Sequence, residues 1–170
     1  MPELPIDSPM RRRLPPLLRH AWYGLNQAFR RRIAPLGITP DQFTILRVLL
    51  EARSEGVTQR ELAQRMGSDP NTISALVQRM ETAELLERLP HENDRRAHRL
   101  RLTEAGRKTY KKARPIALDL QAEILAGLKP EELESFLTAL QTISKACQDA
   151  ADRSPSETRV GIRRPPAEYE

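Results

Sequence analysis

A single change of hydrophobic period, after Ala83, limits this chain to very few folds. Up to this residue, apolar side chains recur every three or four positions, which is the spacing of helices that bury one face. Beyond it, Leu86–Leu89 and Arg99–Leu102 alternate apolar and polar side chains, as strands with one buried face do. The residues from Pro90 to His98 are polar, and helical spacing returns after the second strand. The sequence therefore predicts a mainly α fold with one small β-hairpin.

Two short helices precede the predicted hairpin. Thr58 and Glu61 have the spacing of a capping box, and the helix that they begin ends at Gly67. The segment Ser68–Pro70 caps a further helix, since serine and aspartate are good N-caps and proline suits the first helical position. Two capped helices that are joined through a glycine are typical of a helix-turn-helix, whose second helix can enter the major groove of DNA.

Longer helices are predicted on both sides of this region. Leu14–Ile33 is amphipathic, and a second helix, apolar on nearly all sides, begins at Pro40. After the hairpin, one helix begins at Thr103 and a last one near Pro130. Helices with apolar faces of this length do not remain single in water, so we expect them to pack against other elements.

Basic residues are concentrated around the hairpin. The chain has a formal net charge of +5, and Arg88–Arg114 holds ten basic residues against three acidic ones. This segment is therefore +7, and the rest of the chain is slightly negative. A local excess of cations suits a surface that meets a polyanion such as DNA.

The helix after Ser68–Pro70 carries side chains that can read bases. Asn71 and Gln78 can pair with adenine edges, Thr72 and Ser74 can contact a base edge or a phosphate, and Arg79 can contact guanine or the backbone. The alternative is an ordinary solvated helix face. The candidate DNA contacts of this helix are Ser68, Pro70, Asn71, Thr72, Ser74, Gln78 and Arg79.

The hairpin tip holds two further candidates, Arg95 and Arg96. Guanidinium groups on an exposed loop can enter a narrow minor groove or bind phosphate in a bidentate manner. Asp94 is unexpected on a surface that meets phosphate, and we interpret it as a hydrogen-bond acceptor that orients Arg96. A solvated turn aspartate is the alternative interpretation.

Five segments follow one another along the chain: Leu36–Phe43, Leu62–Met66, Thr72–Glu81, Asp94–Arg96 and Leu102–Gly106. Together and in this order they resemble the MarR family. The resemblance covers roughly residues 17–150, and it implies a winged helix-turn-helix with the base-reading helix in the major groove and the hairpin, called the wing, in the minor groove. It also implies a dimer built from the first helix and the last two. The family's Asp-x-Arg wing element falls on Asp94 and Arg96.

Two departures from the family pattern stand out. Ala75 lies where relatives often carry a longer polar or basic residue, which points to a different operator sequence. The segment Met80–Glu84 lacks the usual glycine before the wing, which leaves the predicted fold unchanged.

The resemblance also implies a domain organisation. Residues 14–37 and 104–150 would form a helical dimerisation domain, and residues 38–103 would form the DNA-binding domain. Residues 1–13 and 151–170 are rich in proline and charge, so we expect flexible tails there.

Many members of this family bind small phenolic or other aromatic anions between the dimerisation helices and the DNA-binding domain. Five residues of this chain are candidates to line such a site, although aromatic residues at helical spacing usually belong to a core. These candidates are His20, Trp22, Tyr23, Phe43 and Arg47.

Other classes of protein fit the sequence less well. The three histidines, His20, His91 and His98, lack metal-ligand spacing, and no glycine-rich phosphate loop is present, so we expect neither an enzyme nor a cofactor or metal. With one cysteine, Cys147, no intramolecular disulfide can form. No secretory signal or membrane-length apolar run is present, so we expect no membrane partner and a cytoplasmic protein.

The predicted function is a transcriptional regulator, a repressor, that binds a pseudo-palindromic operator in double-stranded DNA as a homodimer and responds to a small aromatic or anionic effector. A helical protein-interaction module without sequence-specific DNA binding is the alternative. The basic hairpin discriminates between the two, because an interaction module has no need of it.

Overall fold

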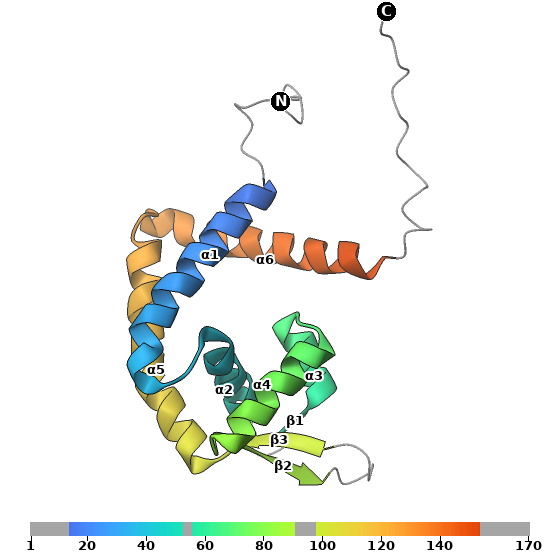
Figure 1. The fold of residues 1–170 in the computed structure, drawn as a ribbon. Helices are drawn as coiled ribbons and strands as arrows, with labels where there is room; N and C mark the ends of the chain where they lie inside the picture. Colours follow the sequence, from blue (N-terminus) through green and yellow to red (C-terminus); the bar gives the residue numbers. More distant parts are fainter. Residues whose placement is uncertain (1–13, 53–55, 91–97, 154–170) are drawn as a thin grey trace, which may run out of the picture. The chain divides into compact units, whose positions relative to one another are not determined.

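Helices make up most of the chain in the computed structural model, which describes residues 14–52, 56–90 and 98–153 (Figure 1). The chain divides into two compact units, residues 1–122 and residues 123–170. The first unit contains five α-helices and a three-stranded antiparallel sheet among its described residues, so the predicted mainly α fold with a small β wing is confirmed. We find no membrane-spanning helix in the described ranges.

Two helices begin the first unit, and the second begins at Pro40, as the sequence predicts. They are α1 (Leu14–Ile33), which continues into the 3-10 turn η1 (Ala34–Leu36), and α2 (Pro40–Glu51). Gly37 adopts the left-handed conformation (φ +70°) that closes η1. Thr39 and Gln42 form a reciprocal capping box at the start of α2, with N···O distances of 3.3 and 2.9 Å.

The predicted helix-turn-helix is present. Its helices are α3 (Gln59–Met66) and α4 (Pro70–Thr82). The backbone N–H of Glu61 donates to the hydroxyl of Thr58 at 3.2 Å, and the Glu61 carboxylate accepts the backbone N–H of Thr58 at 2.7 Å. The carboxylate also accepts the hydroxyl of Thr58 at 2.9 Å, and the two hydrogen bonds that it accepts, first the one from the backbone N–H and then the one from the hydroxyl, hold the pKa of Glu61 below its ordinary value. Gly67, at φ +57°, ends α3 and turns the chain toward α4.

The predicted hairpin is also present, and each strand is one residue longer than expected. Its strands are β2 (Leu86–Pro90) and β3 (His98–Leu102). Leu86 lies opposite Leu102, and Pro90 lies opposite His98. The antiparallel register places Leu86, Leu100 and Leu102 on the same side, toward the core, whereas Leu89, which lies opposite Arg99, is on the other face and half-buried.

A third strand, β1 (Val57–Thr58), was not expected from the sequence. It pairs with β3, so the strand order is β1-β3-β2. Two residues are too few to show an alternating pattern, and therefore the strand left no periodic signal. Gly56 makes the pairing possible: it has a φ of +66°, and a Cβ at this position would lie 2.6 Å from the carbonyl oxygen of Leu100.

A long helix, α5 (Glu104–Leu125), follows the sheet, and its start is fixed against the turn between α4 and β2. The hydroxyl of Thr103 accepts the backbone N–H of Gly106 at 3.0 Å and donates to the carbonyl of Glu84. A Cβ on Gly106 would lie 2.0 Å from the carbonyl oxygen of Leu85, so only glycine fits there without a backbone shift.

The described part of the second unit contains α6 (Pro130–Asp152). Its predicted apolar stripe leaves three large side chains open to solvent: Phe136, Leu137 and Leu140 are 42%, 41% and 40% exposed. The predicted tail at residues 1–13 and most of the predicted tail at 151–170 lie outside the described residues.

One hydrophobic core joins the helices and the sheet of the first unit. Phe29 of α1 packs edge-on against Phe43 of α2, whose ring stacks on Tyr110 of α5, with centroid distances of 5.0 and 5.4 Å. The largest fully buried side chains of this core are Ile33, Ile45, Leu46, Leu49, Leu62, Ile73, Met80, Leu86 and Leu100.

Candidate nucleic-acid interface

One face of α4 belongs to the core and the other is open to solvent. Ile73 and Met80 are fully buried, because they recur with Leu76 and Val77 on the inner side of the helix. The outer side carries exposed residues of mostly polar character. They are Asn71, Thr72, Ser74, Ala75, Gln78, Arg79 and Thr82.

Asp69 caps the N-terminus of α4. Its Oδ1 accepts the backbone N–H groups of Asn71 and Thr72 at 3.0 and 2.9 Å, and its Oδ2 accepts the hydroxyl of Thr72. The hydrogen bonds from the Thr72 hydroxyl and backbone, followed by the one from Asn71, hold the pKa of Asp69 below its ordinary value. The hydroxyl proton of Thr72 is thus used within the cap.

Arg79 and the two amide side chains of α4 differ in how they are engaged. The Nε of Arg79 donates to the carbonyl oxygen of Ala75 at 3.1 Å, which holds this guanidinium along its own helix. Asn71 and Gln78 have no side-chain hydrogen bond to any residue that the structure describes. Their donors and acceptors are therefore available on the outer face of α4.

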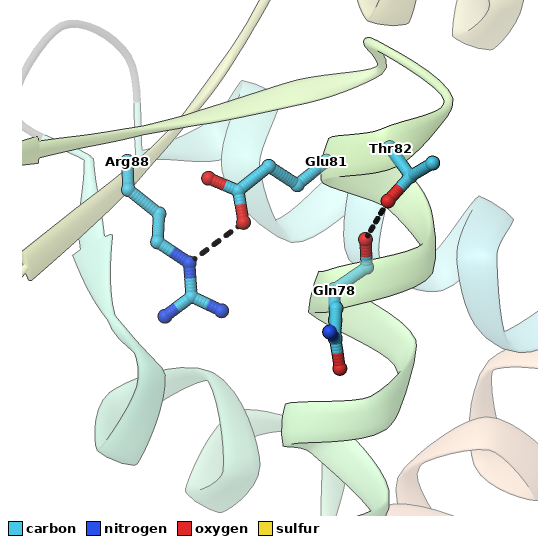
Figure 2. A network of polar contacts seen from close by, with 4 residues as sticks. All are labelled: Gln78, Glu81, Thr82 and Arg88. Atoms are coloured by element: carbon cyan, nitrogen blue, oxygen red, sulfur yellow. Dashed lines mark hydrogen bonds and ion pairs between the residues drawn. The ribbon is translucent and has the colours of Figure 1, made fainter.

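An ion pair joins α4 to the wing (residues 86–102). The Nε of Arg88 on β2 lies 3.0 Å from Oε2 of Glu81 on α4 (Figure 2). On the same helix, the hydroxyl of Thr82 donates to the carbonyl oxygen of Gln78 at 3.0 Å, while the side chain of Gln78 extends away from both contacts (Figure 2).

The strands of the wing hold two further arginines in contacts within the protein. The Nε of Arg101 lies 3.7 Å from the carboxylate of Glu87, its partner across the two strands. An Nη of Arg99 donates to the carbonyl oxygen of Gly56 at 3.4 Å. The predicted tip residues Asp94, Arg95 and Arg96 lie outside the described residues.

The first half of α5 continues the basic segment. Lys108 lies 4.0 Å from Glu104, an exposed pair one helical turn apart. The other cations of this helix half are Arg107, Lys111, Lys112 and Arg114.

The remaining predicted contacts lie at the start of α4. Ser68 is half-buried, and its backbone N–H donates to the carbonyl oxygen of Ala63 at 3.1 Å. Pro70 is exposed at the first helical position. Together with Asn71, Ser74 and Gln78, it forms part of one continuous outer surface of the helix.

The predicted effector residues do not form one cluster. Trp22 and Tyr23 are 63% and 62% exposed and line a hollow of about 290 Å³ on α1 and the start of α2. Phe43 is instead buried in the aromatic core, and Arg47 lies 3.8 Å from Glu51 on the surface of α2. His20 is exposed on α1 outside the lining of this hollow. The other residues that line it are Asn26, Gln27, Arg30 and Asp41.

Within the described ranges, no three histidine, cysteine, aspartate or glutamate side chains lie together in a group that could hold a metal ion.

Among the contacts that the sequence did not reveal, two involve α4: the Thr72 hydroxyl in the Asp69 cap and the Glu81–Arg88 ion pair. The first has a local signal, since threonine three residues after an N-cap aspartate can reach its carboxylate. The second has none, because seven residues separate a helix position from a strand position and only the turn between them brings the charges together.

This arrangement defines a winged helix-turn-helix protein: a capped helix displays a polar face, and a small sheet follows it in the chain. Comparison with known proteins agrees. The family model described as MarR family matches residues 36–97. The HTH-type transcriptional regulator BilQ of Clostridium symbiosum is 32% identical over 98 residues, which are 58% of this chain and 68% of BilQ. The chain belongs to the MarR family, and it is a transcriptional regulator of the winged helix-turn-helix class.

Two solved structures are informative. The transcriptional regulator MOSR of M. tuberculosis, solved in complex with DNA, matches with a TM-score of 0.66 and 28% identity, covering 80% of this chain and 98% of MOSR. CouR of Rhodococcus jostii RHA1, solved with bound p-coumaroyl-CoA, matches with a TM-score of 0.66 and 26% identity, covering 75% of this chain and 88% of CouR.

Proposed function

We propose that this regulator is a homodimeric repressor that binds a pseudo-palindromic operator in double-stranded DNA. In this proposal α4 lies in the major groove and the wing lies at the adjacent minor groove. The observation that carries it is the division of α4 into a buried apolar face and an exposed polar face with two unengaged amides, Asn71 and Gln78. A helix shaped in this way can enter a groove without losing its support from the core. The relative MOSR was solved in complex with DNA, which supports DNA binding by this chain.

The proposed dimer uses residues 14–37 and 104–150, and residues 38–103 form the DNA-binding domain between these segments. Within the first unit, α1 exposes a series of large apolar side chains, of which Trp22 and Tyr23 are the most exposed. Within the second, α6 exposes Phe136, Leu137 and Leu140. Exposed apolar surface of this kind marks interaction sites. The other exposed large apolar side chains of α1 are Leu14, Leu17 and Leu25.

The wing contributes phosphate contacts in this proposal. Arg95 and Arg96 reach the minor groove or its phosphates, and Asp94 orients Arg96. Because the described wing arginines Arg88, Arg99 and Arg101 contact groups of the protein itself, the tip remains the natural source of wing contacts to DNA. The site of action is the cytoplasm, where the DNA of such a regulator is found.

A small aromatic or anionic effector controls DNA binding in this proposal. The CouR structure, with its bound p-coumaroyl-CoA, supports an effector of this class. The hollow on α1 offers two aromatic rings, Trp22 and Tyr23, and one guanidinium, Arg30, which suit an aromatic anion. An effector can weaken DNA binding only if it binds more tightly to a dimer geometry in which the two recognition helices are wrongly spaced.

The experiment that tests this function is selection of bound duplexes from a random pool by the full-length protein. The proposal expects enrichment of a palindromic consensus whose half-sites are centred about 10 base pairs, or a multiple, apart. Sedimentation of the free protein should give the mass of a dimer. A monomer that enriches no duplex at low ionic strength would contradict the proposal and favour a protein-interaction module.

A further inference from the structure

Three residues form one line along the exposed face of α4. Asn71, Ala75 and Gln78 are spaced by four and three residues, so their side chains lie one above the other on the helix surface. We call these three residues the reading strip. Ile73 and Met80, on the opposite side of the helix, are fully buried, which directs the strip straight away from the core.

The strip offers two amides separated by a methyl group. Within the described chain, the side chains of Asn71 and Gln78 have no hydrogen-bonding partner, so each can present its donor and acceptor together. In the major groove, adenine presents a matching pair, the N7 acceptor and the N6 amino donor. The methyl group of Ala75 can make only an apolar contact, and the apolar group of the major groove is the C5-methyl of thymine.

Two arginines, one on α4 and one on the first wing strand, have partners within the protein. Arg79 is held through its Nε by the carbonyl oxygen of Ala75 at the edge of the strip, and Arg88 is held by Glu81 (Figure 2). The common contact that selects guanine is a bidentate arginine or lysine on O6 and N7. The strip itself contains no such side chain.

We infer that the operator half-site presents A·T pairs to α4, with adenines at Asn71 and Gln78 and a thymine methyl at Ala75. The inference rests on the proposed function, because it assigns the bases that the proposed recognition helix reads. Ala75 is the decisive residue. Its short side chain lets both amides reach the base edges, and position 75 therefore has no arginine or lysine that would select guanine.

The test compares the consensus selected from random duplexes by four full-length proteins: wild type, Gln78→Ala, Ala75→Arg and the control Gln121→Ala. Gln121 is an exposed glutamine on α5, so its variant matches Gln78→Ala in chemistry but lies away from the strip. Wild type and Gln121→Ala should return the same half-site with A·T pairs at its centre. Gln78→Ala should lose preference at one position, and Ala75→Arg should gain a G·C pair at the central position.

Equilibrium titrations measure the size of each effect. Replacing one contacted A·T pair by G·C should weaken wild-type binding by about 5- to 150-fold, and the same replacement should have little effect on Gln78→Ala. A half-site with G·C pairs at its centre, or an unchanged consensus for both strip variants, would overturn the inference while the protein still binds a palindrome. Failure to enrich any duplex would overturn the proposed function and this inference together.

Discussion

Arg88 on β2 donates a hydrogen bond of 3.0 Å from Nε to Oε2 of Glu81, so the recognition helix and the wing are joined by an ion pair as well as by the chain between them. The two side chains are 30% and 41% exposed. Pairs at this exposure stabilise a protein by only about 0.2–1 kcal/mol, because water screens their charges. The pair also links a side chain of the first wing strand to α4, and we expect it to limit the movement of the wing relative to that helix.

Glu81→Gln is therefore expected to affect operator binding more than stability. The free energy of unfolding should change by about 1 kcal/mol or less, whereas the affinity for the selected operator should fall because the wing is less well oriented. Glu84→Gln removes the same charge from an exposed residue at the end of α4, so it controls for the loss of repulsion between a carboxylate and DNA. Equal operator affinities for the two variants in fluorescence anisotropy would contradict a role for the ion pair.

Asp69→Ala should lower the free energy of unfolding, because it removes the acceptor for the first N–H groups of α4 and for Thr72. The folded-state pKa of Asp69 lies below its ordinary value of 3.8. The stabilisation is therefore fully present above that ordinary value and is lost as the pH falls toward the folded pKa.

Urea unfolding of wild type and Asp69→Ala at several pH values measures this effect. The difference in the free energy of unfolding between the two proteins should be constant near neutral pH and shrink in acid. Asp119→Ala, at an exposed site within α5, removes a carboxylate that caps no helix and is the matched control. A difference between wild type and Asp69→Ala that grows as the pH falls would rule out the cap as its source.

Gly106→Ala is expected to destabilise the protein by roughly 1–3 kcal/mol or more, the usual cost of overpacking, because the new Cβ would collide with the backbone at Leu85. Gly24→Ala on α1 makes the same chemical change where nothing lies within 4 Å of the new Cβ. It should stabilise the helix by up to about 1 kcal/mol. Thermal melts that move both variants in the same direction would show that the contact between α5 and the end of α4 is not as tight as described.

Arg96→Ala tests the wing tip. If this guanidinium contacts DNA, operator binding should weaken by about 1–3 kcal/mol, and the dependence of log Kd on log salt should lose about one unit of slope. The melting temperature should not change. Titrations at several salt concentrations measure the slope, and an unaltered affinity would remove the wing tip from the mechanism.

The sequence predicted the fold well where the information is local. Caps such as Thr58 with Glu61 involve residues only three apart, so the sequence predicts them directly. The change of hydrophobic period after Ala83 extends over whole strands, so it is also visible in the sequence. The strand β1 could not be read, because Val57 and Thr58 become a strand only when β3 lies beside them.

The candidate site was predictable in its outline and less so in its details. The outer face of α4 follows from helical periodicity, but whether a side chain on that face is free depends on its neighbours in space. The side chain of Thr72 is engaged by Asp69, while the side chain of Gln78 is not engaged by any residue in the described ranges. Phe43 shows the same limit: an aromatic residue at helical spacing can face a ligand or a core, and the rings of Phe29 and Tyr110 place it in the core.

The central claim is that two copies of α4, fixed in one dimer, read successive major grooves on the same side of the duplex. The most direct measurement is the affinity for the selected operator with and without about five extra base pairs, half a helical turn, between its half-sites. The account predicts one dimer per native operator, and a large loss of affinity for the lengthened duplex, because the second half-site then lies on the opposite side. Equal affinity for both duplexes, or one monomer bound at each half-site, would contradict it.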